Sequence, residues 1–262
     1  MAGTTIGAVL RSTHAHCLQL SQAEPLEWGV AYTSTRFAGL PDANQLREFM
    51  VPDENDVPTA CAAIDACFAR RGLTCLRWAP AGEQSHDALG RLLSEKGYQR
   101  RDRFACALAE WPDVTTRDDV RILPARAMQR EYRRTFTAPA GPHRDLRAEA
   151  GLERLDDAGY EASLAVLADR AVGRCALLQT GDVGRVIDLY VLPEYQRRGV
   201  GTALLAHVLG VARRFMARTV CLAVGVDNSP ALRCVERMGF VRDGTLVEFH
   251  HPDAVLPNDD DA

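Results

Sequence analysis

A six-residue segment, Gln196-Arg197-Arg198-Gly199-Val200-Gly201, carries the residue types best suited to binding an anion. Glycine has no Cβ, so the backbone at 199 and 201 can come close to a ligand. If a helix begins here, its first amide groups have no partner within the helix. Those amides and the positive end of the helix dipole favour a phosphate or pyrophosphate, and Arg197 and Arg198 add positive charge. The segment therefore predicts an anion site.

Other phosphate-binding motifs fit this segment poorly. A nucleotide P-loop needs a lysine directly after its glycines, and Gly201-Thr202-Ala203 has none. A dinucleotide-binding turn needs three glycines, and only two are present. A glycine turn without any ligand is the remaining alternative.

The flanking elements must hold this segment in place. Residues 186–192 are apolar and rich in β-branched types, which predicts a strand that Pro193 ends. After residue 223, Asp227-Asn228-Ser229-Pro230 supplies capping side chains and a first-turn proline for a helix that should stop at Gly239. A strand over 219–224 precedes that helix.

Between the strands over 186–192 and 219–224, apolar residues at helical spacing predict a long helix with one buried stripe. The stripe is made of Leu204, Leu205, Val208, Val211, Ala212 and Phe215.

The strand over 186–192 also carries polar side chains. Because side chains alternate along a strand, Asp188 and Tyr190 should share one face, with Ile187, Leu189 and Val191 on the other. Upstream, the patterns predict helices and strands in alternation, which indicates an α/β fold. The strands are expected over 120–124, 162–168 and 173–178, and the helices over 128–136 and 144–155.

Composition excludes several classes of protein. The chain has 31 basic and 35 acidic residues and a net charge of −4, so no overall field attracts nucleic acid or a membrane surface. Eight cysteines stand singly without a C-x-x-C pair, so neither a zinc site nor a redox dithiol is indicated, and we expect no metal. Arg11, His14 and His16 interrupt any apolar run that a secretory signal would need. We expect a cytoplasmic protein.

The first half of the chain contains a fainter copy of the second. Residues 91–100 parallel residues 233–242 at an offset of 142 residues, the distance from Arg91 to Arg233. A helix over 60–71 and a strand over 73–78 would correspond to the long helix and to the strand near Cys221. Two copies of one unit suggest domains over 1–112 and 118–250, a linker over 111–119 and an acidic tail within 251–262.

The glycine segment has no counterpart in the first copy. The corresponding stretch, residues 51–58, is acidic and contains no glycine. Carboxylates repel a phosphate, so this copy should not hold a pyrophosphate.

The second half resembles the GNAT superfamily of acyl-CoA-dependent N-acetyltransferases. The resemblance covers about 118–250, and the first half resembles a degenerate repeat of the same fold. It rests on four segments in order: Ile187 to Pro193, Gln196 to Gly201, Asn228-Ser229-Pro230-Ala231, and Met238-Gly239-Phe240. The fold implied is α/β, with two GNAT-like domains that each have a mixed, partly antiparallel sheet flanked by helices.

The resemblance also implies where the donor, acetyl-CoA, binds. The strand over 186–192 would separate from the strand over 219–224 and leave a slot for the pantetheine arm. Backbone groups of Val191 and Leu192 would pair with that arm, and Asn228 would contact the cofactor from the other side. The pyrophosphate would be wrapped by Gln196, Arg197, Arg198, Gly199, Val200, Gly201 and Thr202.

For catalysis, the resemblance implies an acidic general base at Asp188, acting directly or through water. The alternative is a structural carboxylate paired with a neighbouring arginine. Many family members have a tyrosine as general acid seven residues after the asparagine, where this sequence has Val235. Tyr190 or a water molecule could replace it, and Cys234 next to it is expected to serve packing.

Several other polar residues are weaker candidates. Glu248, His250 and His251 could face the acceptor, although a solvated pair of histidines is the simpler interpretation. Arg144 and Arg147 could recognise a carboxylate or phosphate on the acceptor.

These observations predict an N-acetyltransferase acting by direct attack of a small-molecule amine on acetyl-CoA. The alternatives are a transferase acting on protein amines and a non-catalytic protein that binds or senses coenzyme A. The acyl chain could also be longer than acetyl. We expect a monomer or homodimer, because the repeat could form a pseudo-dimer within one chain.

Overall fold

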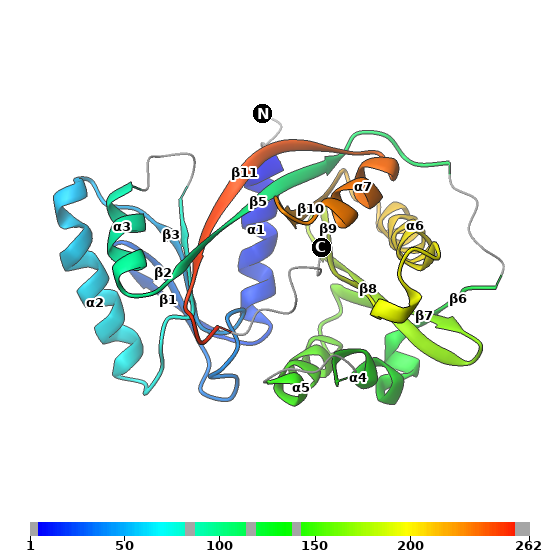
Figure 1. The fold of residues 1–262 in the computed structure, drawn as a ribbon, viewed down its shortest axis with the longest axis horizontal. Helices are drawn as coiled ribbons and strands as arrows, with labels where there is room; N and C mark the ends of the chain where they lie inside the picture. Colours follow the sequence, from blue (N-terminus) through cyan, green and yellow to red (C-terminus); the bar gives the residue numbers. More distant parts are fainter. Residues whose placement is uncertain (1–4, 82–86, 114–118, 138–142, 255–262) are drawn as a thin grey trace. The chain divides into compact units, whose positions relative to one another are not determined.

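The structure is a computed structural model that describes residues 5–81, 87–113, 119–137 and 143–254 (Figure 1). Its described residues fall into two compact units, each assembled from separate stretches of chain. Unit 1 takes 5–16 and 104–244, and unit 2 takes 17–103 and 245–254. This division differs from the expected domains 1–112 and 118–250, because β5 (Gln99–Leu108) and β11 (Phe240–His250) contribute residues to both units.

Unit 1 is built on a mixed sheet. Its strands follow the order β11-β5-β10-β9-β8-β7-β6. The pairs from β6 to β9 are antiparallel, and β9 and β10 are parallel. The strands not yet given bounds are β6 (Arg121–Pro124), β7 (Tyr160–Leu167), β8 (Arg170–Thr180), β9 (Val183–Val191) and β10 (Thr219–Gly225).

Helices cover both faces of this sheet (Figure 1). Side chains alternate between the faces, so Leu177 joins the core under α6 while Leu178 joins the core under α4 and α5. The expected mixed, partly antiparallel sheet flanked by helices is therefore confirmed. The helical segments with residues in unit 1 are α1 (Thr5–Leu18), η2 (Ala125–Ala127), α4 (Gln129–Thr137), α5 (Arg144–Arg154), η3 (Pro193–Tyr195), α6 (Val200–Arg214) and α7 (Ser229–Arg237).

Unit 2 has a smaller sheet with the order β1-β2-β3-β4-β11. β3 and β4 are parallel, and the other pairs are antiparallel. Its core contains Trp78 and Phe249, which face each other across the β4–β11 pair. The remaining elements are β1 (Gln22–Leu26), β2 (Gly29–Thr33), β3 (Gln45–Phe49), β4 (Arg77–Pro80), η1 (Glu54–Asp56), α2 (Val57–Ala69) and α3 (Asp87–Glu95).

Two sequence predictions about elements were wrong. The strand expected over 73–78 begins only at Arg77. The Leu73 amide donates to the Phe68 carbonyl in the last turn of α2, and the Leu76 amide donates to the Asn44 carbonyl directly before β3. Phe215 does not extend the buried stripe of α6. It lies one residue beyond the helix and is 43% exposed.

The two halves of the chain share a detailed local feature. Helices α3 and α7 are each 9 residues long, and each is followed two residues later by a glycine with positive φ. Gly97 has φ 84° and Gly239 has φ 85°, the left-handed conformation that closes a helix without a Cβ penalty. The spacing between them is the 142 residues seen in the sequence.

Three further observations bear on the sequence predictions. Within the described residues, no helix is long and apolar enough to cross a membrane. Seven cysteines are buried and Cys234 is half-buried, in keeping with packing roles. The expected linker and acidic tail lie partly outside the described residues, at 114–118 and 255–262.

Candidate functional site

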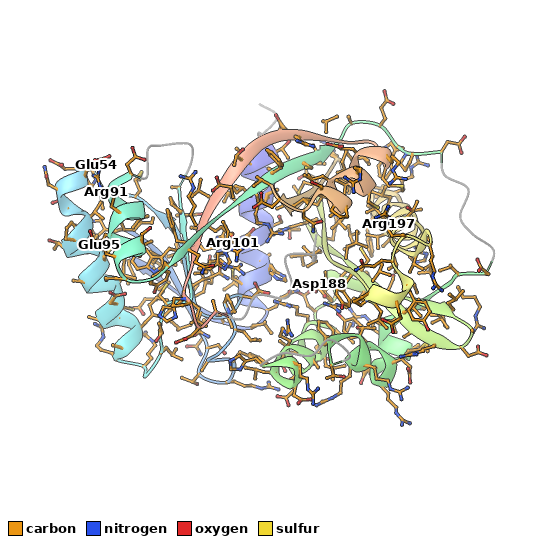
Figure 2. All side chains as sticks on the ribbon, in the orientation of Figure 1. Glu54, Arg91, Glu95, Arg101, Asp188 and Arg197 are labelled. Carbon is orange, nitrogen blue, oxygen red and sulfur yellow. The ribbon has the colours of Figure 1, made fainter. Side chains whose placement is uncertain are left out.

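The predicted anion segment joins β9 to α6 in unit 1. Residues 196–199 are exposed, and Figure 2 shows Arg197 at this end of the helix. Arg197 has φ 61° and Gly199, the N-cap residue, has φ 77°. The Gln196 side chain donates from Nε2 to the Val191 carbonyl at 3.1 Å and so ties the segment back to the strand. The segment thus presents two arginines and the start of a 15-residue helix to solvent.

The two glycines of the segment have different explanations. Gly199 is required by its backbone, because φ 77° is costly for residues with a Cβ. Gly201 lies in the first turn of α6 with ordinary helical backbone, and a Cβ there would meet only Val191 Cγ2 at 3.7 Å. Neither conformation nor packing within the described protein explains Gly201. Close approach of a ligand to the backbone, which the sequence predicted, stays a prediction.

Strands β9 and β10 pair over only part of their length. The register joins Thr219 to Val183, Val220 to Gly184 and Cys221 to Arg185, and no further β9–β10 pair follows among the described residues. The expected separation of these strands toward the glycine segment agrees with this register.

The backbone amide and carbonyl of Leu192 both make hydrogen bonds within the protein, which the sequence did not suggest. Its amide donates to the Val172 carbonyl at 2.9 Å, and its carbonyl accepts from the Tyr195 amide at 2.8 Å. A pantetheine contact at Leu192 can therefore use only the second lone pair of the carbonyl. Val191 is half-buried beside Gly201.

Asn228 is the N-cap of α7, as its sequence position predicts. Its Oδ1 accepts from the Ala231 amide at 3.0 Å, and the side chain is buried. A cofactor contact by Asn228 stays a prediction. The Oδ1 lone pair that accepts from the Ala231 amide cannot also make that contact.

Asp188 sits at an irregularity in β9. The residue has φ 55°, and the β8–β9 register shifts there because β9 carries an extra residue. Ile187 consequently packs with α4 and α5, and Leu189 packs with α6. Asp188 and Tyr190 do share the face toward α4, but the expectation that Ile187 lies opposite them was wrong. The bulge interrupts the alternation.

The Asp188 carboxylate, which is half-buried, accepts a hydrogen bond from the Tyr160 hydroxyl at 2.6 Å (Figure 2 labels Asp188). Burial alone would raise the pKa of Asp188, but Arg154, Arg174, His16 and the Tyr160 hydroxyl outweigh it and lower that pKa below its usual value. The group is an ionised carboxylate at neutral pH. The charges of Arg154 and Arg174 act on Asp188. This fits the alternative to catalysis that the sequence left open, a structural carboxylate beside an arginine.

Arg174 stacks on Tyr190, and its charge acts on Asp188. Its guanidinium lies 3.9 Å from the Phe136 ring centre and 4.6 Å from that of Tyr190, and Nη1 donates to the Thr135 carbonyl at 2.9 Å. Tyr190 is 5% exposed. The arginine therefore holds Tyr190 within a packed layer against α4.

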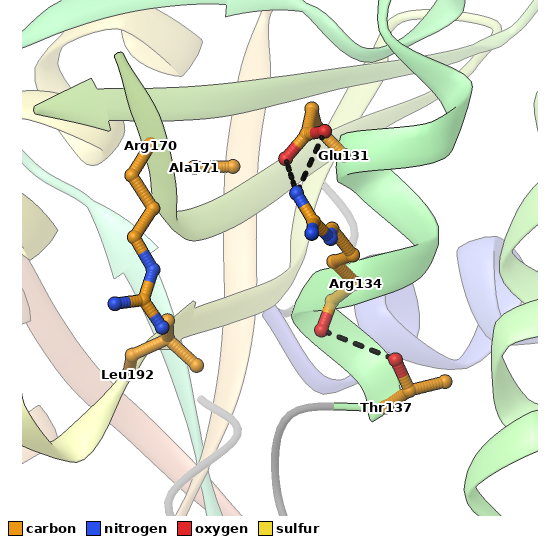
Figure 3. A pocket seen from close by; sticks show the side chains of 6 residues that line it. All are labelled: Glu131, Arg134, Thr137, Arg170, Ala171 and Leu192. Carbon is orange, nitrogen blue, oxygen red and sulfur yellow. Dashed lines mark hydrogen bonds and ion pairs between the residues drawn. The ribbon is translucent and has the colours of Figure 1, made fainter. Parts of the chain in front are cut away.

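A pocket of about 420 Å³ lies beside this layer, between α4, the start of β8 and the end of β9 (Figure 3). Arg134 pairs with Glu131 at 3.1 Å on one wall, and Arg170 stands on another. The pocket offers charges of both signs. Its lining residues are Glu131, Arg134, Thr137, Arg170, Ala171 and Leu192.

Val235, where the usual tyrosine would stand, is fully buried in the core under α6. One of the weaker candidates, His250, is placed differently from expectation. His250 is not solvated. It is 5% exposed in unit 2 and contacts Glu248, which pairs with Arg47 at 3.2 Å. Glu248 and His250 thus belong to a buried ionic cluster, because a charge away from water needs a partner.

Unit 2 lacks the features of the candidate site at the matching positions. Its parallel strands β3 and β4 stay paired to Phe49 and Pro80, and the Ala81 amide continues the ladder to the Phe49 carbonyl at 3.0 Å. Before α2, the Asp53 carboxylate caps the Asn55 amide at 2.9 Å. Asp53 thus caps the short helix η1 that precedes α2, and the acidic segment 51–58 has no glycine, unlike the segment before α6.

Sequence reasoning missed the residues that surround Asp188, namely Tyr132, Tyr160, Arg154 and Arg174. They come from α4, β7, α5 and β8, and no spacing in the sequence connects them. Only the tertiary fold brings them to one carboxylate.

Residues 125–240 match the model of the acetyltransferase (GNAT) family. The GNAT match falls within unit 1 and includes both Asp188 and the glycine segment. Part of the chain is also similar to curated proteins named as N-acetyltransferases. An N-alpha-acetyltransferase of Sulfurisphaera tokodaii is 41% identical over 58 residues, which are 22% of this chain and 35% of that protein.

A second curated relative, the ribosomal protein bS18 alanine N-acetyltransferase of Escherichia coli, is 31% identical over 71 residues. That match covers 27% of this chain and 47% of the relative. The chain thus spans between 35% and 47% of the length of these two relatives.

Solved structures share the fold over more of the chain. A protein of unknown function from Staphylococcus epidermidis has a TM-score of 0.68 at 16% identity and covers 88% of this chain and 94% of its own. A GCN5-related N-acetyltransferase from Kribbella flavida has a TM-score of 0.65 at 16% identity and covers 96% of both chains. At this identity the likeness describes the fold alone.

Proposed function

We propose that this protein is an N-acetyltransferase that transfers an acetyl group from acetyl-CoA to an amine of a small molecule. The observation that carries the proposal is the contrast between the two units. Unit 1 combines an arginine-flanked helix start with a parallel strand pair that separates, and unit 2 has an acidic segment without glycine before α2 and a strand pair that stays joined. We infer one donor site, in unit 1.

The donor substrate would lie along the part of β9 that β10 leaves unpaired. Its pyrophosphate is assigned to the first amides of α6 with Arg197 and Arg198, since an anion satisfies groups that the helix leaves unpaired. Gly201 leaves room for it. Val191, Leu192 and Asn228 are assigned to the pantetheine arm, with the limits on Leu192 and Asn228 given above.

Transfer requires a neutral amine. In the proposed reaction an ammonium group of the acceptor loses one proton to Asp188, directly or through water, and the amine nitrogen then bonds to the thioester carbon. The carbon–sulfur bond breaks and its electron pair stays on sulfur. The nitrogen loses its second proton and the thiolate takes one up, so the products are the amide, coenzyme A thiol and one released proton. We assign Tyr190 or a water molecule as the proton donor, because Val235 has no proton to give.

The pocket favours a small acceptor over a protein chain. Its volume of about 420 Å³ is within the range of small-molecule sites, and Glu131 could pair with a cationic acceptor. The curated relatives include enzymes named for protein amines, so peptides are the necessary comparison.

We further propose that the two halves are copies of one GNAT unit. The shared helix closure at Gly97 and Gly239 supports this. So do two acidic residues with positive φ at the irregular point of matching strands, Glu48 in β3 and Asp188 in β9.

Titration calorimetry and an acceptor screen test the function. We expect one coenzyme A per chain, loss of binding when Arg197 and Arg198 are both changed to Glu, and thiol release with small amines at least tenfold faster than with amino-terminal peptides. Two coenzyme A molecules per chain, or none, would contradict the single-site proposal. Binding without turnover of any amine would favour the second candidate, a coenzyme A-binding protein, which the burial of Val235 supports.

A further inference from the structure

Two buried tyrosines form a chain of hydroxyl groups that ends at Asp188. The Tyr132 hydroxyl on α4 lies 3.1 Å from the Tyr160 hydroxyl on β7, and the Tyr160 hydroxyl lies 2.6 Å from Asp188 Oδ2. Both tyrosines are fully buried at 0% exposure. Water is therefore excluded from the two hydroxyls.

Counting protons fixes the direction of this chain. An ionised carboxylate can only accept, so Tyr160 donates its single proton to Asp188. The Tyr160 oxygen then accepts, and Tyr132 must be the donor. Burial, and next the charge of Asp188, raise the pKa of Tyr160 well above its usual value, so the hydroxyl keeps its proton at neutral pH.

Each element packed around Asp188 contributes a group. Arg154 on α5, Arg174 on β8 and His16 on α1 are the basic side chains whose charge acts on the carboxylate. Cys175, also on β8, stays a thiol because burial and then Asp188 raise its pKa. Tyr160 donates a hydrogen bond to a defined carboxylate oxygen, Oδ2, at 2.6 Å.

We propose that Tyr160 is a positioning residue for acyl transfer, that it fixes Asp188 through Oδ2 and directs Oδ1 to the acceptor, and that Tyr132 orients Tyr160. This inference rests on the proposed function, since it assigns a role to Asp188 in that reaction. Asp188 lies on a bulge with φ 55°, so a hydrogen bond from a neighbouring element helps to fix the orientation of its carboxylate. Tyr160 is the first residue of β7 and is held by the sheet.

The main test is a double-mutant cycle between Tyr160→Phe and Asp188→Asn. With the amine identified in the screen, we expect Tyr160→Phe to lower kcat about tenfold and Asp188→Asn to lower it about a hundredfold or more. In the Asp188→Asn background, Tyr160→Phe should lower kcat less than about twofold, because its effect passes through the carboxylate. Affinity for coenzyme A should not change.

A matched control is Tyr98→Phe. Tyr98 is a buried tyrosine of unit 2 whose hydroxyl donates to the Cys75 carbonyl at 2.6 Å, the same length as the Tyr160 bond but to an uncharged acceptor. Both variants should lower the thermal midpoint, and only Tyr160→Phe should lower kcat. Tyr132→Phe should lower kcat about twofold to threefold, which provides a second variant if Tyr160→Phe does not fold.

Proton NMR gives a readout that needs no activity. At pH 7 the wild type should show a slowly exchanging downfield hydroxyl resonance that disappears in Tyr160→Phe, moves upfield in Asp188→Asn and is unchanged in Tyr98→Phe. Additive effects of Tyr160→Phe and Asp188→Asn on kcat, or absence of that resonance from the wild type, would overturn the inference. If no amine is acetylated, the proposed function fails and the resonance still decides whether Tyr160 holds Asp188.

Discussion

Gly201 offers the most direct test of the donor site at the level of one residue. Gly201→Ala places a Cβ at 3.7 Å from Val191, an ordinary contact, and replaces a poor helix former by a good one. We expect stability to rise by about 0.5–1 kcal/mol and coenzyme A affinity to fall at least about tenfold. Thermal unfolding and calorimetry measure the two effects.

Gly210→Ala is the matched control. Gly210 lies in the same helix, and a Cβ there would meet only the Arg214 side chain at 3.8 Å. Stability should rise by a similar amount while coenzyme A binding stays unchanged. Equal binding by both variants would show that Gly201 is a glycine for a reason other than the ligand.

Some site residues could be predicted from the sequence, and others could not. The glycine segment and the cap at Asn228 depend on local chemistry, so their residue types reveal them. The bulge at Asp188 depends on a non-glycine residue with positive φ, which no local pattern predicts. Tyr160 is remote in sequence and becomes relevant only through the sheet.

At the level of elements, the glycines that end α3 and α7 should respond differently to substitution. Gly97→Ala meets only Pro252 Cγ at 3.7 Å, so its cost is backbone strain of about 1–2 kcal/mol. Gly239→Ala would place a Cβ 2.1 Å from the Glu110 carbonyl oxygen, so the backbone must move as well. We expect a clearly larger loss for Gly239→Ala, measured by chemical denaturation. Equal losses would mean that the contact relaxes freely.

Element prediction was most successful where turn residues and apolar spacing agree. The helices and strands from β6 to β11 lie close to their expected ranges for this reason. The start of β4 was misplaced because residues 73–76 have side chains typical of a strand, while the Leu73 amide closes the end of α2. Nothing in the sequence pattern identified α1, which belongs to unit 1 up to His16.

At the level of the whole molecule, stability should fall at acid pH through the ionic cluster of unit 2. Burial alone would raise the pKa of Glu248, but Arg77, His250 and Arg47 outweigh it and hold that pKa well below its usual range. Its stabilisation is therefore present above the unfolded pKa and is lost as pH falls through the folded one. Burial lowers the pKa of His250, so protonation below about pH 6.5 also favours unfolding.

Glu248→Gln should destabilise the protein by about 3–5 kcal/mol at pH 7, because Arg47 and Arg77 would lose a buried partner. It should also flatten the acid part of the stability curve. Glu95→Gln, at an exposed position of α3 in the same unit, should change stability by less than about 0.5 kcal/mol. Urea unfolding from pH 2 to 8 measures both, and an unchanged acid slope in Glu248→Gln would exclude this cluster as its cause.

The composition of unit 2 has a consequence for the order of folding. Phe249, in the core of this unit, and Glu248, the partner of its buried arginines, come from β11, which the ribosome makes only after the whole of 104–244. A nascent chain that has released residues 17–103 therefore lacks the acid that Arg47 and Arg77 share, and among the described residues only Arg77 has another acidic partner, Asp42. Its Trp78 also lacks the neighbouring Phe249. The sheet of unit 2 begins first and is completed last, after unit 1 has been synthesised.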